Sequence, residues 1–72
     1  MRKTTIIEIL ILLSGKSQKD FAAMVNIPAP NLSEMKTGKR DIPLGKFISW
    51  CKLADVNPID VFKEFYKQKE IL

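Results

Sequence analysis

The side chains that could do chemistry in this sequence are mainly charged groups, because the chain lacks the histidines and paired cysteines that most often act as zinc ligands or activate nucleophiles. The chain of 72 residues has no histidine and a single cysteine, Cys51. Zinc sites and histidine-assisted nucleophilic catalysis need residues that this chain lacks. There is also no glycine-rich loop of the kind that binds phosphate. We therefore expect a binding protein that is not an enzyme and uses no cofactor or metal ion.

The positive charge is concentrated in one part of the chain. The formal net charge is +4, and residues 16–40 hold five basic and two acidic residues. Residues 1–15 carry an excess of one positive charge, and the charges of residues 41–72 cancel. A basic surface fits a polyanion such as DNA. A solvated basic surface without a partner would give the same small total.

A short helix is expected at the start of this basic stretch. Ser17 can cap it, since its hydroxyl can accept a hydrogen bond from a free backbone N–H, and Asp20 lies at the positive end of the helix dipole. Phe21, Ala22 and Val25 then share one apolar face. Asn26 tolerates a positive φ and is expected to end the helix.

A second short helix is expected immediately afterwards. Pro28 and Pro30 restrict the chain to a bend and a helix start. Leu32 and Met35 are three residues apart, so they supply the buried side of this helix. Gly38 is expected to end it. The charges of residues 16–40 are therefore carried by two helices joined by a tight turn.

This arrangement resembles the helix-turn-helix of the lambda-repressor-like family (Cro/CI, XRE) of DNA-binding proteins. The positions that carry the resemblance are Gln18, Phe21, Ala22, Val25, Asn26, Ile27, Leu32, Met35, Gly38, Lys39 and Arg40. The resemblance implies an all-α, five-helix lambda-repressor-like domain over residues 1–72, with the motif at about 17–38. The alternative is an unrelated small bundle of amphipathic helices.

The first element, residues 4–14, has an ambiguous pattern. Seven of the eight residues from Ile6 to Leu13 are apolar, which fits a helix or a strand. The family has a helix here, and a lone strand would have no partner. A helical stripe would bury Ile6, Ile9, Leu10 and Leu13, and would leave Ile7, Ile11 and Leu12 as surplus apolar surface. That surplus predicts either contact with another chain or a helix wedged more deeply between its neighbours.

Two further helices are expected in the second half of the chain. Pro43 suits the start of the first, and Asn57 with Pro58 suits the start of the second. The buried face of the first should contain Leu44, Phe47, Ile48, Cys51 and Ala54, with Trp50 either completing the core or staying partly open. The last helix should bury Val61, Phe62 and Phe65, and the pattern does not decide whether Tyr66 also packs inward.

The resemblance implies that the second helix of the motif enters the DNA major groove. The base-facing positions would then be Ala29, Pro30, Ser33 and Glu34, with Asn31 among the DNA-binding candidates but facing sideways or capping the helix. The phosphate-binding positions would be Gln18, Lys19, Lys36, Lys39 and Arg40. Alanine and proline offer at best a contact to a thymine methyl, and glutamate accepts only from cytosine while repelling phosphates. We therefore expect weak base readout and salt-sensitive binding that depends on phosphate contacts.

Two functions follow from this interpretation. The first is a transcriptional regulator of a temperate-phage type genetic switch that binds double-stranded operator DNA, with a homodimer as a possible form. The second is an antirepressor, similar to phage modulators of repression, that binds a CI-type repressor and blocks its DNA-binding face. Its contact candidates are Ser33, Glu34, Ile7, Ile11 and Leu12. Because no cleavage site or membrane-length segment follows Arg2 and Lys3, we expect the cytoplasm of a bacterial host and no membrane partner.

Overall fold

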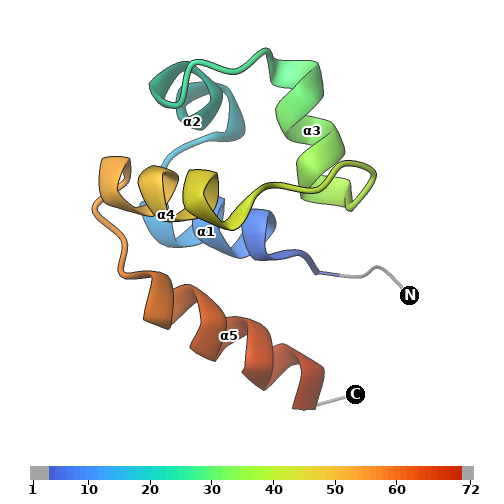
Figure 1. The fold of residues 1–72 in the computed structure, drawn as a ribbon, viewed down its shortest axis with the longest axis vertical. Coiled ribbons are helices and arrows are strands. Elements are labelled where there is room, and N and C mark those ends of the chain that lie inside the picture. Colours follow the sequence, from blue (N-terminus) through green and yellow to red (C-terminus); the bar gives the residue numbers. More distant parts are fainter. Residues whose placement is uncertain (1–3, 71–72) are drawn as a thin grey trace.

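The computed structural model describes residues 4–70, and in this range the chain forms five α-helices and no strand (Figure 1). The helices are α1 (Ile6–Ser14), α2 (Gln18–Met24), α3 (Ala29–Thr37), α4 (Leu44–Leu53) and α5 (Pro58–Glu70). The expected all-α class with five helices is confirmed. Within the described range, every helix is too short or too polar to cross a lipid bilayer.

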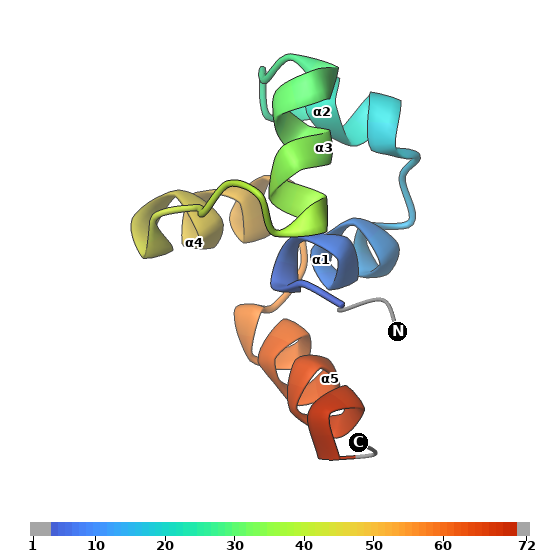
Figure 2. The same cartoon turned by 90° about the vertical axis from the view of Figure 1, so that its right-hand side faces the viewer.

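The helices are arranged around α1 and α4, which lie in the middle of the molecule. α2 and α3 lie on one side of this pair and α5 lies on the other (Figures 1 and 2). α1 packs against both α3 and α5, and α2 packs against α3. The rings of Phe21 and Trp50 meet edge to face at 6.0 Å and join α2 to α4. The rings of Phe47 and Phe62, 5.5 Å apart, join α4 to α5.

The core contains side chains from all five helices. Its buried members are Ile7, Ile9, Leu10, Ile11, Phe21, Ala22, Leu32, Met35, Phe47, Trp50, Cys51 and Val61. Trp50 therefore completes the core, and Cys51 is the small core residue that its register predicts. Burial raises the pKa of the Cys51 thiol because the charged thiolate would lose solvation. The group therefore stays a protonated, uncharged thiol. The expectation that Leu44 is buried is wrong, since 66% of this side chain is exposed.

The buried face of α1 is wider than the expected stripe. Ile7 and Ile11 are 2% and 8% exposed, whereas Leu13, expected inside, is exposed. The reason is that α1 has neighbours on two sides, α3 and α5, so a single stripe does not cover both contacts. Ile7 and Ile11 therefore fit the second alternative, a helix wedged deeply between its neighbours, and they leave almost no surface for another chain. Leu12 is the surplus residue that stays accessible, at 71% exposure.

Four of the described helices end at a residue with a left-handed backbone, and the first of these residues is Gly15, which follows α1 with a φ of 72°. Asn26 has a φ of 58° and follows α2, and Gly38 has a φ of 86° and follows α3, as expected from their residue types. After Asn26, the Ile27 N–H donates to the Ala22 carbonyl at 3.0 Å, which closes the end of the helix. Asp55 ends α4 in the same way, with a φ of 57°. The bends that orient α3 are therefore fixed by local residues.

The last helix begins where its sequence predicts and packs less completely than expected. Pro58 is its first residue, and the Asn57 side-chain oxygen accepts from the Ile59 N–H at 2.9 Å. Phe62 was expected in the core, but 42% of it is exposed and only part of its ring packs on α4. Tyr66 is exposed as well. The outer side of α5 therefore keeps aromatic surface in contact with solvent.

Thr5 joins the start of α1 to the end of α3. Its hydroxyl oxygen accepts from the Glu8 N–H at 3.2 Å and donates to the Lys36 carbonyl at 2.7 Å. We expect Thr5→Val to lower the free energy of unfolding by about 1–2 kcal/mol, because both the helix cap and a half-buried bond are lost. Urea unfolding measures this change. Thr5→Ser is the matched control and should retain most of the stability, and an unchanged midpoint for Thr5→Val would contradict the assignment.

Candidate nucleic-acid interface

The two sides of α3 differ in burial, as its sequence predicts. Leu32 and Met35 are buried and fix the inner side of the helix in the core. On the outer side, Ala29, Pro30 and Ser33 are exposed. Glu34, the fourth expected base-facing position, is half-buried, and so is Asn31. The outer side of α3 is therefore accessible along most of its length.

Two of the expected phosphate-binding residues contact each other. The Lys36 ammonium, on the last turn of α3, donates to the side-chain oxygen of Gln18 at 3.2 Å. Both side chains are half-buried, and the bond ties the start of α2 to the end of α3. A lysine ammonium has three donors, so this bond leaves donors for another acceptor. The structure therefore brings these two candidates together, and each also has a structural role.

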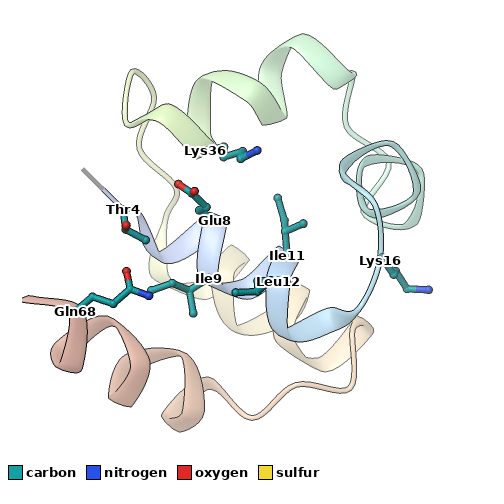
Figure 3. Close-up of a pocket in the computed structure, with 8 residues that line it drawn as sticks. All are labelled: Thr4, Glu8, Ile9, Ile11, Leu12, Lys16, Lys36 and Gln68. Atoms are coloured by element: carbon teal, nitrogen blue, oxygen red, sulfur yellow. The ribbon is translucent and has the colours of Figure 1, made fainter. Parts of the chain in front are cut away.

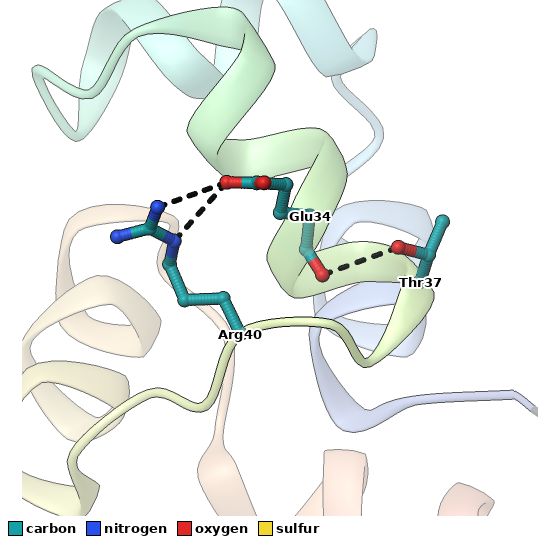
Figure 4. A network of polar contacts seen from close by, with 3 residues as sticks. All are labelled: Glu34, Thr37 and Arg40. Atoms are coloured by element: carbon teal, nitrogen blue, oxygen red, sulfur yellow. Dashed lines mark hydrogen bonds and ion pairs between the residues drawn. The ribbon is translucent and has the colours of Figure 1, made fainter.

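The basic residue after α3 is also paired (Figure 4). The Arg40 guanidinium donates through Nη2 and Nε to one oxygen of Glu34, at 2.9 and 3.2 Å. The two side chains are 51% and 45% exposed. An ion pair this exposed contributes about 0–1 kcal/mol, so a phosphate can compete for the guanidinium. In the free protein, however, Glu34 offsets the charge of Arg40 at the outer side of α3.

Sequence reasoning placed Glu34 and Arg40 at the same interface but missed their pairing. The sequence feature that could have predicted this ion pair is the opposite charge of the two residues, which are six positions apart with the left-handed turn at Gly38 between them. The Lys39 N–H reaches back to the Glu34 carbonyl at 2.9 Å, and this turn brings the next residue over the helix. The Thr37 hydroxyl donates to the same carbonyl at 3.2 Å, as Figure 4 shows.

Two expected cations remain free of ion pairs in the part of the chain that the structure describes. Lys19, at the start of α2, and Lys39, just after α3, are exposed and have no carboxylate within 4 Å. Each is close in sequence to one member of the bonded pair: Lys19 directly follows Gln18, and Lys39 is three residues after Lys36. Exposed lysines beside an accessible helix can contact phosphates without reading bases.

A separate groove of about 350 Å³ lies between α1, α3 and α5 (Figure 3). Its lining residues are Thr4, Glu8, Ile9, Ile11, Leu12, Lys16, Lys36 and Gln68. Ile11 and Leu12 are two of the three α1 residues expected at a protein interface, and the third, Ile7, lies in the core. Lys36, a residue of the candidate interface, also lines this groove.

Comparison of the chain with known protein families, with curated proteins and with solved structures found no match. What supports a function is therefore the geometry and the charge of α2 and α3. These two helices are joined by a tight turn with a left-handed residue, Asn26, and have a buried inner side, an accessible outer side and basic residues at both ends.

Proposed function

We propose that this protein is a DNA-binding transcriptional regulator with a lambda-repressor-like helix-turn-helix, acting in a temperate-phage type genetic switch. The observation that carries the proposal is the accessible outer side of α3. Two exposed lysines accompany it: Lys19 at the start of α2 and Lys39 just after α3. The major groove of B-DNA is about 12 Å wide and admits one α-helix. In this proposal α3 enters the groove, and α2 packs behind it.

Phosphate contacts dominate the proposed complex. Lys19, Lys39 and Arg40 are exposed and can reach the backbone, and the Gln18 amide and Lys36 support them. The exposed residues of α3 offer one hydroxyl and several apolar groups, which discriminate poorly between bases. Binding should therefore be modest in affinity, similar for many sequences and strongly weakened by salt.

The double substitution Lys39→Ala with Arg40→Ala tests this proposal. We expect binding to every duplex to weaken by roughly tenfold near 100 mM salt, because two phosphate contacts are lost. The slope of log K against log salt should become shallower by about 1.8, at about 0.9 per phosphate. Fluorescence anisotropy with labelled duplexes at several salt concentrations measures both quantities.

The matched control removes two lysines from α5 by Lys63→Ala with Lys67→Ala. This variant has the same net charge as the first but keeps all basic residues in and after α2 and α3, so its DNA binding should fall far less. Equal loss in both variants would mean that net charge alone attracts DNA. Loss for one operator only would make Lys39 and Arg40 base-reading residues, and the assignment to phosphates would be wrong.

A second candidate function is an antirepressor that binds a CI-type repressor, and the observation that favours it is the position of Glu34. Its carboxylate lies among the expected DNA contacts of α3, where it repels phosphates, and it already accepts two hydrogen bonds from a guanidinium. An arginine that a repressor uses for DNA could take the place of Arg40 there. Ser33 is exposed next to it and could add a polar contact.

A further inference from the structure

A single contact fixes the direction of the side-chain amide of Gln18. Its Oε1 accepts from the Lys36 ammonium at 3.2 Å, which joins the first residue of α2 to the last turn of α3. An amide has an oxygen that accepts and an NH2 group that donates, and a half-turn about the last side-chain bond exchanges the two. An ammonium only donates, so it can face only the oxygen. The Gln18 NH2 group therefore lies on the side of the amide away from Lys36.

The NH2 group held in this way suits a phosphate. Among residues 4–70, Gln18 makes no other side-chain hydrogen bond, and its side chain is half-buried, so part of it meets solvent. Phosphate oxygens only accept hydrogen bonds, so the amide oxygen would repel a phosphate and the NH2 group can bind it. A positive charge next to the amide oxygen also polarises the amide and strengthens its N–H donors.

The Lys36 side chain is itself held in place. It is half-buried, lines the groove between α1, α3 and α5, and extends from α3 toward α2 (Figure 3). Glu8 lines the same groove, but no carboxylate of residues 4–70 lies within 4 Å of the ammonium. The contact that the ammonium makes is the one with Gln18. The amide therefore needs little further ordering when a ligand arrives, which lowers the entropy lost on binding.

We propose that Lys36 is a positioning residue for DNA binding that acts through Gln18. Lys36 occupies the amide oxygen, and the NH2 group of Gln18 donates to a phosphate oxygen of the DNA backbone. This inference rests on the proposed DNA contact and assigns the two residues different parts in it. The sequence pattern predicts both as phosphate-binding residues, whereas here the effect of Lys36 on affinity depends on Gln18.

Burial and bonding distinguish Lys36 from the other lysines of the candidate interface. Lys19 and Lys39 are exposed and have no partner within residues 4–70, so their ammonium groups are free to follow the DNA backbone. Lys36 is half-buried and uses one of its donors on Gln18. A direct contact of Lys36 with phosphate would have to weaken or share that bond.

The first test is a double-mutant cycle with Lys36→Met and Gln18→Ala. Methionine keeps an unbranched apolar stem in the groove but cannot donate to the amide. We expect each single variant to weaken binding of a labelled mixed-sequence duplex about fivefold, the factor typical of one hydrogen bond. The double variant should lose little more, because both substitutions remove the same contact. Fluorescence anisotropy measures all four affinities.

The matched control is Lys16→Met. Lys16 lines the same groove and carries the same charge, but it has no bond to Gln18. This variant should weaken binding less than Lys36→Met, and its loss should multiply with that of Gln18→Ala. All the substituted side chains are exposed or half-buried, so circular dichroism should show every variant folded at the assay temperature.

The second test observes the amide itself by 15N NMR of the full chain. The sequence has two glutamines, Gln18 and Gln68, and each gives its own side-chain NH2 signals. Adding the duplex should shift the NH2 signals of Gln18 and leave those of Gln68, on α5, unchanged. Lys36→Met should abolish most of the Gln18 shift. Lys36→Arg, which still donates to the amide oxygen, should restore it.

The outcomes separate this inference from the proposed function. No binding of the duplex by the unaltered chain would overturn both. Binding with an unshifted Gln18 NH2 group, or a loss of about twenty-fivefold in the double variant, would overturn only the role of Lys36. A salt slope that becomes shallower by about 0.9 in Lys36→Met, but not in Lys16→Met, would make Lys36 a direct phosphate contact and would also overturn it.

Discussion

Phe21→Ala is expected to lower the free energy of unfolding by about 3–5 kcal/mol, the loss typical of a fully buried phenylalanine. Phe21 has no exposed surface, and its ring meets Trp50 edge to face, so its removal takes away the contact between α2 and α4. A chain of this length has a total stability of about 4–11 kcal/mol. The variant should therefore be largely unfolded at 37 °C, and circular dichroism during urea and thermal unfolding measures the change.

The matched control for this variant is Leu12→Ala. Leu12 is an apolar residue on α1 with 71% of its side chain exposed, so its truncation should change stability by less than about 0.5 kcal/mol. A loss below about 1 kcal/mol for Phe21→Ala would mean that α2 is not anchored through this ring. Because α2 supports α3, DNA binding by Phe21→Ala should be lost together with the fold.

Glu34→Arg is expected to strengthen DNA binding by roughly thirtyfold at low salt. The substitution removes a carboxylate that repels phosphates, adds a cation on α3 and releases Arg40 from its ion pair. These three changes act in the same direction. Anisotropy titrations at several salt concentrations should show a steeper salt slope, by about 0.9 for each phosphate gained.

The same substitution separates the two candidate functions. A repressor complex that uses Glu34 should be weakened by Glu34→Arg at least tenfold, since an attraction becomes a repulsion between like charges. A gel-shift titration of the neighbouring promoter region, with and without the companion repressor, measures both effects at once. Retarded DNA with this chain alone favours the regulator, and release of bound repressor favours the antirepressor. Unchanged affinity for both partners would remove Glu34 from either interface.

Glu34→Gln is the intermediate control. It removes the charge but keeps the size of the side chain, so Arg40 becomes free without a new cation on α3. We expect a gain in DNA binding of only a few-fold. A gain as large as that of Glu34→Arg would mean that the released Arg40 accounts for the whole effect.

The helix ends could be predicted from sequence because they depend on local residues. Asn26 and Gly38 adopt the left-handed backbone that their residue types tolerate, and Asn57 caps α5. The same local rules identify Leu32 and Met35 as the inner side of α3. These features define the two helices of the candidate interface, so most of its scaffold was accessible from sequence alone.

Tertiary contacts decided what the sequence left open or misplaced. Ile7 and Ile11 are buried because α1 has two neighbouring helices, and a run of seven apolar residues does not reveal which sides are covered. Leu44 has the spacing of a core residue, but no described neighbour covers more than about a third of it. At the interface, the bonds of Lys36 to Gln18 and of Arg40 to Glu34 cross a bend. Spacing along the chain therefore does not indicate them.

The hydroxyl of Thr5 has a consequence for how the molecule opens. One side chain bonds both the first turn of α1 and the last turn of α3, so each turn helps to hold the other in place. Hydrogen exchange of amides in these two turns should therefore follow a single cooperative opening. The segment just beyond, which carries Lys39 and Arg40, is then anchored at a distant point of the chain, so its basic groups are already positioned when a ligand arrives.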